Sequence, residues 1–180
     1  MRMRIVLFSM MVCCMLVVKP AAYGVDTELT RHTMSGLQGV NVMVEELQPN
    51  IQKYAQRFNL TKEQLQKEIE QRLQKAGIQV LTGDAWLKTP GRPVLYVNVN
   101  THEYEKYWYA FDVTVNLNQI VVLEADPKLK TLASTWDISI TGVANIGTLN
   151  TIRSNVEILI DRFVQAYRSV NPKKQEDVRR

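Results

Sequence analysis

The fold is decided by residues 95–123, LYVNVNTHEYEKYWYAFDVTVNLNQIVVL, in which apolar and polar side chains alternate on either side of a short charged segment. Successive side chains of a β-strand point to opposite faces of its sheet, so every second residue shares a face. Leu95, Val97 and Val99 share a face in the first alternation. In the second, the apolar face consists of Tyr109, Phe111, Val113, Val115 and Leu117. The stretch therefore predicts two antiparallel strands of a hairpin, each with one apolar and one polar face.

Facing residues of such a hairpin lie on the same side of the sheet, so a register shift by one residue is excluded. One allowed register pairs Val99 with Phe111 and places Asn98 opposite Asp112. The neighbouring register, shifted by two residues, satisfies the same pattern. In residues 120–123 both faces are apolar, and we expect that end of the strand to be covered on both sides.

Other segments carry the periodicity of strands or of helices. Thr61 and Gln64 form a capping-box pattern at the start of a helix, and Gly77 is a typical residue to end it. Apolar residues at spacings of three and four mark two helical stripes. The predicted strands are 39–46, 78–81 and 134–142, and the predicted helices are 61–76 and 149–170. Glycine and proline residues in 82–93 predict a loop before the hairpin.

The elements follow the order β-α-β-β-β-β-α, and two amphipathic helices each need an apolar surface to cover. The economical arrangement is an α+β two-layer sandwich. Its sheet is mixed and mostly antiparallel, both helices lie on one face, and the face of Asn, Asp, Thr and Ser side chains stays open. We expect residues 39–172 to form this single domain, 25–38 to lead into it, and 173–180 to form a charged flexible tail.

The first 24 residues have the pattern of a secretory signal peptide. Arg2 and Arg4 precede an unbroken apolar run, and small residues at Ala22 and Gly24 suit cleavage after Gly24. The apolar run of 14 residues is short for a transmembrane helix, which needs about 20. We therefore expect a periplasmic or secreted protein with no transmembrane anchor after cleavage. A retained anchor is the alternative.

Cleavage at this site changes what the composition implies. Both cysteines, Cys13 and Cys14, lie in the signal peptide, so the mature chain has no thiol for a disulfide, a nucleophile or a metal site. Arg2, Arg4 and Lys19 leave as well, and the 22 basic residues of the chain fall to 19 against 18 acidic ones. A net charge of +1 argues against nucleic acid as a partner.

No motif of the mature chain indicates a metal site or a nucleophile, and we expect no cofactor. His32 and His102 lie in unrelated segments. The sequence HEYE at 102–105 lacks the second histidine of the zinc motif that places two histidines one helical turn apart. A Gly-x-Ser-x-Gly nucleophile motif and a phosphate-binding loop are both absent from the sequence.

Paired carboxylates are also excluded as a catalytic centre by strand register. Asp112 and Asp137 share the polar face of the predicted sheet. We expect Asp137 to lie opposite Asn118 or Ile120, which leaves the two carboxylates about 20–26 Å apart. The acid and base of glycosidases lie about 5–10 Å apart.

The polar face and the aromatic turn of the hairpin are the candidate binding surface. A face with little charge can meet another protein at modest desolvation cost, and aromatic side chains beside amides suit a protein, a peptide or a sugar. The candidate binding residues are Asn98, Asn100, Tyr104, Tyr107, Trp108, Asp112, Thr114 and Asn116. The alternatives are a face that only contacts water and aromatic side chains that fold down to cap the end of the sheet.

Most of the mature chain is spanned, in order, by the segments GLQGVNVMVEEL, AGIQVL, TPGRPVLYVNVNT, LNQIVVL, STWD and IRSNVEILIDRFVQAYRSVNP. In this order they resemble a family of small secreted bacterial proteins of unknown function, and that resemblance implies no activity. The layout of two helices and a mixed sheet is also similar to the small α/β modules of curli-secretion-type proteins and of TolB amino-terminal domains, which act in envelope assemblies.

We therefore expect a non-enzymatic interaction module of the bacterial envelope, which binds a protein partner through the open polar face and the aromatic hairpin. The first alternative is a protein that binds envelope glycan or a small ligand through the same aromatic side chains. The second alternative is a hydrolase whose site the sequence does not reveal.

Overall fold

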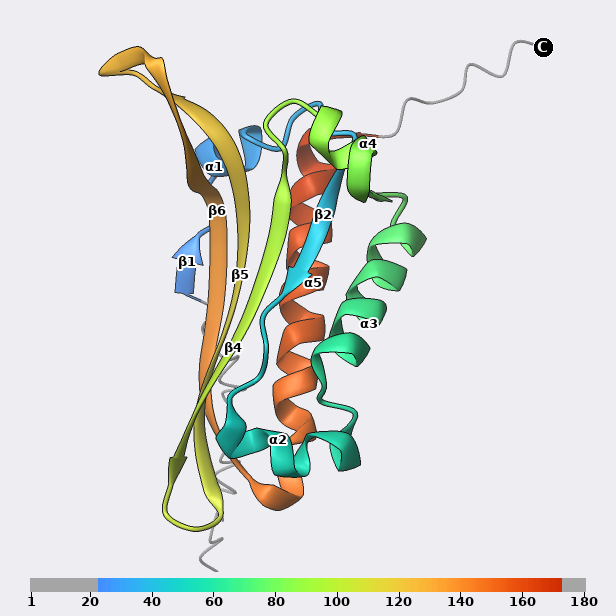
Figure 1. Cartoon of the computed structure of the whole chain (residues 1–180), viewed down its shortest axis with the longest axis vertical. Helices are drawn as coiled ribbons and strands as arrows, with labels where there is room; N and C mark the ends of the chain where they lie inside the picture. Colours follow the sequence, from blue (N-terminus) through green and yellow to red (C-terminus); the bar gives the residue numbers. More distant parts are fainter. Residues whose placement is uncertain (1–22, 173–180) are drawn as a thin grey trace, which may run out of the picture.

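The alternating stretches form three long strands at the centre of a six-stranded sheet (Figure 1). The computed structural model describes residues 23–172. The expected signal peptide, apart from its last two residues, and the expected tail at 173–180 lie outside the described residues. The strands are β1 (Tyr23–Val25), β2 (Gly39–Val44), β3 (Gln79–Val80), β4 (Val94–Tyr104), β5 (Trp108–Leu123) and β6 (Asp126–Asn145).

The order of strands across the sheet is β1-β6-β5-β4-β2-β3. Strand β2 runs parallel to its neighbours β3 and β4, and the remaining pairs are antiparallel. Parallel neighbours need a long crossover connection, and the helical segment between β2 and β3 provides it. The sheet is thus mixed and mostly antiparallel, which confirms the prediction.

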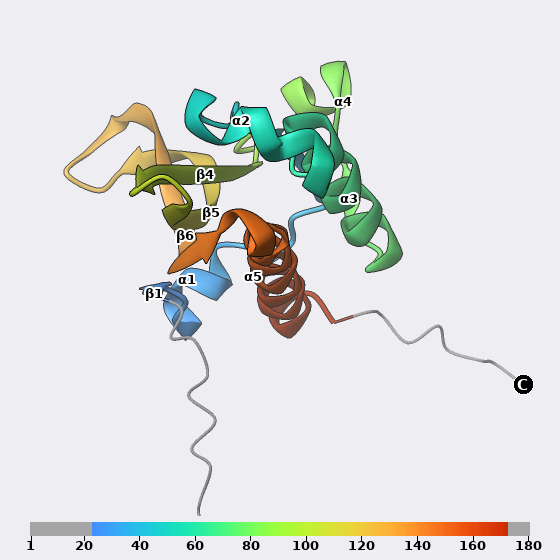
Figure 2. The same ribbon diagram turned by 90° about the horizontal axis from the view of Figure 1, so that it is seen from below.

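Two long helices cover one face of this sheet, α3 (Lys62–Lys75) and α5 (Asn150–Val170) (Figures 1 and 2). They are the two helices that the sequence predicts, and the fold is the expected α+β two-layer sandwich. Short helical segments complete the described chain: α1 (Glu28–His32), α2 (Pro49–Ala55), η1 (Gln56–Phe58), α4 (Gly83–Lys88) and η2 (Ile146–Thr148).

The buried layer between the helices and the sheet is built by the predicted apolar faces. Trp136 of β6 and Phe163 of α5 are both fully buried, and their rings meet edge to face with centroids 5.5 Å apart. Aromatic rings prefer this geometry because the positive edge of one ring meets the negative face of the other. The buried residues predicted for β4 and β5 are Leu95, Val97, Val99, Tyr109, Phe111, Val113, Val115 and Leu117.

Helix α3 begins and ends at the residues that the sequence indicates. The Thr61 side chain accepts a hydrogen bond from the backbone N–H of Gln64 at 3.2 Å. The Gln64 side chain donates to Glu68 instead of returning to the cap, so only half of the predicted capping box forms. Gly77 has φ of 80°, a left-handed conformation that glycine adopts without strain, and the Ile78 N–H bonds to the Leu73 carbonyl to close the helix end.

The short helices were not predicted from the sequence. Pro49 is the first residue of α2, where its missing N–H costs nothing. Residues 83–88, expected to lie in a loop, form α4. Helices of six or seven residues are unstable alone, so tertiary contacts decide them. In α2 the contact is made by the fully buried Ile51.

Residues 25–38 are also more than a lead into the domain. The expected cleavage site after Gly24 lies within β1, where Gly24 is opposite Ile138 of β6. Thr27 and Thr30 form a capping box at the start of α1. Asp26 accepts hydrogen bonds from Trp136 Nε1 at 2.9 Å and from Arg31 Nε at 2.6 Å, and so ties this segment to the core.

Strands β4 and β5 pair in the second of the two predicted registers. Val99 lies opposite Val113, and Asn98 lies opposite Thr114. This shift by two residues keeps every apolar side chain on the helix side, as the parity argument requires.

The predicted pairing of β5 with β6 is wrong by two or four residues, because β6 begins at Asp126, directly after a tight turn, and not at residue 134. Strand β6 also contains a bulge. Asp137 lies opposite Asn116, and the register shifts between the pairs Leu117–Trp136 and Asn118–Ser134. Thr135 is the extra residue, and it accepts a hydrogen bond from Gln119 Nε2 at 2.8 Å. Asp112 and Asp137 are thus four positions apart along β5, about 13 Å at the rise of a strand. That separation still exceeds the spacing of an acid–base pair.

The expectation that residues 120–123 are covered on both faces is also wrong. Beyond the bulge, β5 and β6 continue as a two-stranded hairpin that leans away from the helix layer (Figures 1 and 2). We call residues 119–134 the arm. Ile120, Val122 and Leu123 are exposed there. The alternation of side chains along a strand shows which face a residue occupies, but it does not show whether a second layer covers that face.

Phe163→Ala will lower the free energy of unfolding by about 3–5 kcal/mol, because it leaves a cavity beneath Trp136. Denaturant unfolding followed by tryptophan fluorescence and circular dichroism measures the change. Ile158→Ala is the matched control on the exposed side of α5, and we expect it to change stability by less than about 0.5 kcal/mol. Equal losses in the two variants would contradict the buried layer described above.

Asp26→Asn will lower stability at neutral pH, and its effect will fade in acid. Hydrogen bonds from Arg31, and then from Trp136, hold the pKa of Asp26 below its ordinary value of 3.8. The stabilisation is therefore complete above the unfolded-state pKa and is lost as the pH falls through the lower folded-state pKa. Urea unfolding of both proteins from pH 7 to pH 2.5 tests this. A gap that stays constant down to the lowest pH would refute the role of the charge.

Candidate functional site

Five of the predicted binding residues form one patch on the face of the sheet opposite the helices. Cross-strand pairing places Asn98 beside Thr114 and Asn100 beside Asp112. The Thr114 hydroxyl donates to Asp112 Oδ2 at 2.7 Å. We call this group the polar patch, and its members are Asn98, Asn100, Asp112, Thr114 and Asn116. All are exposed or half-buried, so their amide and hydroxyl groups are open to a partner.

The segment that precedes the domain does not cover the polar patch. Within it, Asp26 contacts Trp136, and the Thr33 carbonyl accepts a hydrogen bond from Gln119 Nε2 at 3.2 Å. Trp136 and Gln119 are buried residues of the helix side of the sheet. Residues 26–33 therefore lie on the helix side, and the polar patch stays open among the described residues.

The three predicted aromatic residues surround the β4–β5 turn at one end of the polar patch. Tyr104 and Trp108 are the last facing pair of the hairpin. Their side chains are 64% and 45% exposed, and Tyr107 is 55% exposed. The alternative in which these rings fold down to cap the sheet is therefore wrong for this structure. We call these three residues the aromatic end.

A shallow hollow lies at the end of the polar patch, one same-face residue pair before the facing pair of Tyr104 and Trp108. It has a volume of about 480 Å³, and its lining includes Asn100, His102, Ala110, Asp112 and Thr141. The small Ala110 side chain lowers the floor between longer neighbours. On the adjoining strand β6, Val143 is opposite Ala110 and is 65% exposed, which extends the apolar surface. Sequence reasoning missed Val143, because the predicted strand ended at residue 142.

A second hollow of about 890 Å³ lies at the opposite end of the open face, at the base of the arm. Its apolar lining includes Met43, Trp86, Ile120 and Leu132. The buried indole N–H of Trp86 has no hydrogen-bond partner among the described residues. The apolar character of both faces in residues 120–123 was a sequence signal for this region, but it predicted coverage and not exposure.

Tyr96 stands between the polar patch and this second hollow. Its hydroxyl donates a hydrogen bond to the Glu45 carboxylate on the neighbouring strand β2. That hydrogen bond, together with partial burial, raises the pKa of the Tyr96 hydroxyl above its ordinary value. The phenol is thus held as a neutral donor and gives no base for catalysis at physiological pH.

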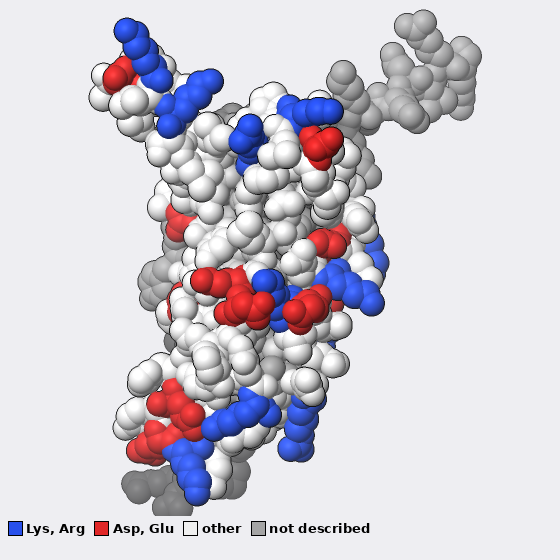
Figure 3. Space-filling view, viewed as in Figure 1, with Lys and Arg blue, Asp and Glu red and all other residues white. Residues whose placement is uncertain are grey.

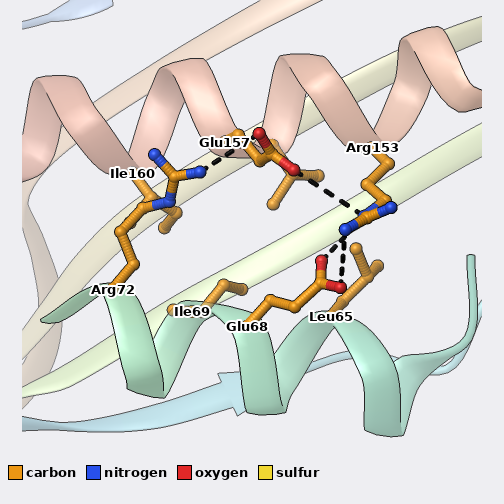
Figure 4. Close-up of a pocket in the computed structure, with 8 residues that line it drawn as sticks. Leu65, Glu68, Ile69, Arg72, Arg153, Glu157 and Ile160 are labelled. Carbon is orange, nitrogen blue, oxygen red and sulfur yellow. Dashed lines mark hydrogen bonds and ion pairs between the residues drawn. The ribbon is translucent and has the colours of Figure 1, made fainter. Parts of the chain in front are cut away.

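A crevice between α3 and α5 is narrow beneath its charged side chains, and a shallow hollow of about 450 Å³ lies outside them, lined by Glu68, Arg72 and Arg153 among others. Arg153 donates to both oxygens of Glu68 at 2.7 and 2.8 Å, and Arg72 pairs with Glu157 at 3.1 Å (Figure 4). The space among them is about 10 Å³, which suits one water molecule at most. Acidic and basic side chains also alternate across the middle of the surface view (Figure 3). These ion pairs hold the two helices together.

The described residues contain no group of three or more His, Cys, Asp or Glu side chains that would hold a metal ion. The chain matches no protein-family model, and comparison with curated proteins gives no significant match. Within residues 23–172, none of the helices combines the length and the apolar character needed to cross a membrane. The two hollows of the open face and the surface between them form the candidate functional site.

Glu68→Gln will lower the free energy of unfolding by about 1 kcal/mol at low ionic strength, because it weakens a two-pronged ion pair that is only partly exposed. The loss will shrink in high salt, where exposed charges are screened. Urea unfolding at low and at high salt measures both effects. A loss that does not depend on salt would show that packing rather than charge joins the helices here.

Proposed function

We propose that this protein is a non-enzymatic interaction module of the bacterial envelope or the secreted fraction, and that it binds a protein partner through the polar patch and the aromatic end. The observation that carries the proposal is the exposure of Tyr104, Tyr107 and Trp108 at the edge of an uncovered sheet face. Tyrosine and tryptophan contribute most strongly to protein interfaces, because each buries a large rigid surface and keeps a polar group for hydrogen bonding.

The chemistry of the polar patch favours a protein surface of low charge over a strongly charged partner. Of its five members only Asp112 carries a charge, and that carboxylate already accepts a hydrogen bond from Thr114. Amide side chains such as Asn98 and Asn116 can pair with backbone or side-chain groups without the desolvation cost of burying an ion. The expected composition of an interface, with aromatic anchors beside polar groups of low charge, is thus present in one area.

The proposed location is supported by the amino-terminal sequence. Two arginines, an apolar run and small residues have the order of a secretory signal peptide, and both cysteines lie within it. A mature domain without cysteine is compatible with the envelope or the exterior, because it has no free thiol that could form an unwanted disulfide in an oxidising compartment.

Binding of envelope glycan is the second candidate, and the shallow hollow favours it. Sugars stack their apolar faces on aromatic rings and hydrogen-bond through their hydroxyl groups. His102 and Asn100 line the hollow, and the facing pair of Tyr104 and Trp108 follows His102 on the same face, so polar groups and aromatic rings lie close together. A hydrolase has no such support, because Asp112 and Asp137 are too far apart to act as an acid–base pair.

A photo-crosslinking amino acid at position 104, in cells that express the full chain, will yield one adduct with a specific envelope protein. Trp108→Ala in the same chain will reduce that adduct by about tenfold, because it removes a neighbouring anchor. The matched control is the same crosslinker at position 158, an exposed apolar site on the helix layer, and it will yield no such adduct. Circular dichroism confirms that each variant is folded.

Two outcomes would contradict the proposal. Equal adducts from positions 104 and 158 would mean that the capture is nonspecific. Retention of the purified protein on isolated envelope glycan, lost in Trp108→Ala and with no protein adduct at position 104, would favour the second candidate.

A further inference from the structure

The arm presents a second exposed surface, at the end of the sheet opposite the aromatic end. It extends past the start of β4, where Val94 lies opposite Asn118, and it leans away from the helix layer (Figure 2). Its exposed large apolar side chains are Ile120, Val122, Leu123, Leu129 and Leu132. Monomeric soluble proteins rarely expose apolar side chains in such a dense group unless the surface is an interaction site.

Three of these side chains, Ile120, Val122 and Leu132, lie on the open side of the arm, while Leu123 and Leu129 lie on the other face. The bulge at Thr135 is what places Leu132 on the open side. In β6 the even-numbered residues from Trp136 onward face the helices, and before the bulge the even-numbered residues face away. Leu132 therefore lies opposite Ile120 on the open face, and its side chain is 62% exposed. The buried Gln119 stabilises the bulge by donating to the Thr135 hydroxyl, so the orientation of Leu132 is built into the fold.

The base of the arm is concave and has basic side chains at its rim. The hollow of about 890 Å³ has apolar walls from Met43, Ile120 and Leu132, with Arg92 and Lys130 among its lining residues. A hydrogen bond of 2.7 Å from the Ile120 N–H to the Gly91 carbonyl holds the loop of Arg92 against the arm. Basic side chains are visible both on the arm and near α4 (Figure 3).

The tip of the arm differs from this base. Its turn carries two acids, Glu124 and Asp126, and one base, Lys128. The arm thus has one excess negative charge at its tip, and its base carries a basic apolar hollow. A surface that holds both halves of a complementary pair can bind a second copy of itself across a two-fold axis.

We propose that the arm binds the arm of a second copy of this chain, open face to open face and antiparallel. A two-fold axis near the facing pair of Val122 and Lys130 places the tip of each arm over the base of the other. Glu124 and Ile120 are four residues apart, about 13 Å along a strand, and Val122 lies midway between them. The axis therefore places Glu124 of one copy over Ile120 of the other, beside the rim where Arg92 is held. Two sheet faces pack about 10 Å apart, and Ile120, Val122 and Leu132 of both arms fill that layer.

The charge of the arm argues for this partner over a lipid surface. The arm carries two acids, Glu124 and Asp126, and two bases, Lys128 and Lys130. Attachment of a protein surface to an anionic bilayer depends on an excess of basic residues, and the arm has none. The same mixture suits pairing with its own symmetry mate, because Glu124 of one copy then lies near Arg92 of the other.

Sedimentation velocity of the protein purified from the full-length chain tests the proposal. We expect a monomer–dimer equilibrium that Leu132→Asp weakens by about tenfold or more, because it buries a carboxylate in the apolar layer. Ile158→Asp is the matched control, an exposed apolar residue on the opposite layer, and it will leave the equilibrium unchanged. Arg92→Glu and Glu124→Arg will each weaken the dimer, and the double variant will recover most of the loss, because the reversed charges meet again across the axis.

Three results would overturn the inference. The wild-type protein could remain monomeric at about 100 μM, a concentration at which a dimer with a Kd of about 1 μM would be almost fully formed. The dimer could survive Leu132→Asp, or the double charge reversal could be no better than the single variants. Finally, a wild-type monomer that sediments with phosphatidylglycerol vesicles, and that Leu132→Asp releases, would assign the arm to lipid. None of these results bears on the crosslink at position 104, which tests the other end of the sheet.

Discussion

The packing of α5 against the three long strands is the contact on which the rest of the structure depends. Trp136 and Phe163 meet at its centre, where both are fully buried. Once one face of β4, β5 and β6 is committed to this layer, the pleat sends every intervening residue to the opposite face. The polar patch is thus a consequence of core packing. Its residues lie where they do because their neighbours in the chain are buried.

A single extra residue changes the character of this opposite face along its length. After Thr135 in the sequence the face is polar, because the alternation of side chains that buries Trp136 places Asp137 and Thr141 on the open side. Before Thr135 the alternation in β6 is reversed, and Leu132 joins Ile120 on the open side. The same sheet face therefore offers hydrogen-bonding groups at one end and an apolar surface at the other. Two such different surfaces suit two different contacts.

The two proposed contacts are compatible because they occupy opposite ends of the sheet. A partner at the aromatic end would meet Tyr104 and Trp108, while a second copy would meet Leu132 and Val122 at the arm. In a two-fold dimer formed by the arms, the aromatic ends point away from the axis and stay accessible. Such a dimer would present its partner site twice, which strengthens binding to a repeated or clustered partner through a higher effective concentration.

The sequence by itself determined the fold class, the two faces of the hairpin strands and the ends of helix α3. Parity in 95–117 named the buried and the exposed residues of two strands correctly, and Thr61 and Gly77 marked the ends of α3. These features depend on neighbours within a few residues, which the sequence displays directly. The polar patch and Trp108 were named in the same way, because alternation assigns each to its face, whereas Tyr104 and Tyr107 were named as residues of the turn.

Only the tertiary structure decided the register of β6, the short helices and the exposure of the arm. Register depends on the position of the Thr135 bulge, which is stabilised by a side chain sixteen residues away, Gln119. The α2 helix depends on the burial of Ile51 in a distant core. For residues 120–123, periodicity could show that both faces are apolar, but only the placement of α3 and α5 shows that neither helix covers them. Coverage is a property of the whole assembly of layers, because the free energy of burial depends on which surfaces meet and not on the order of residues within one strand.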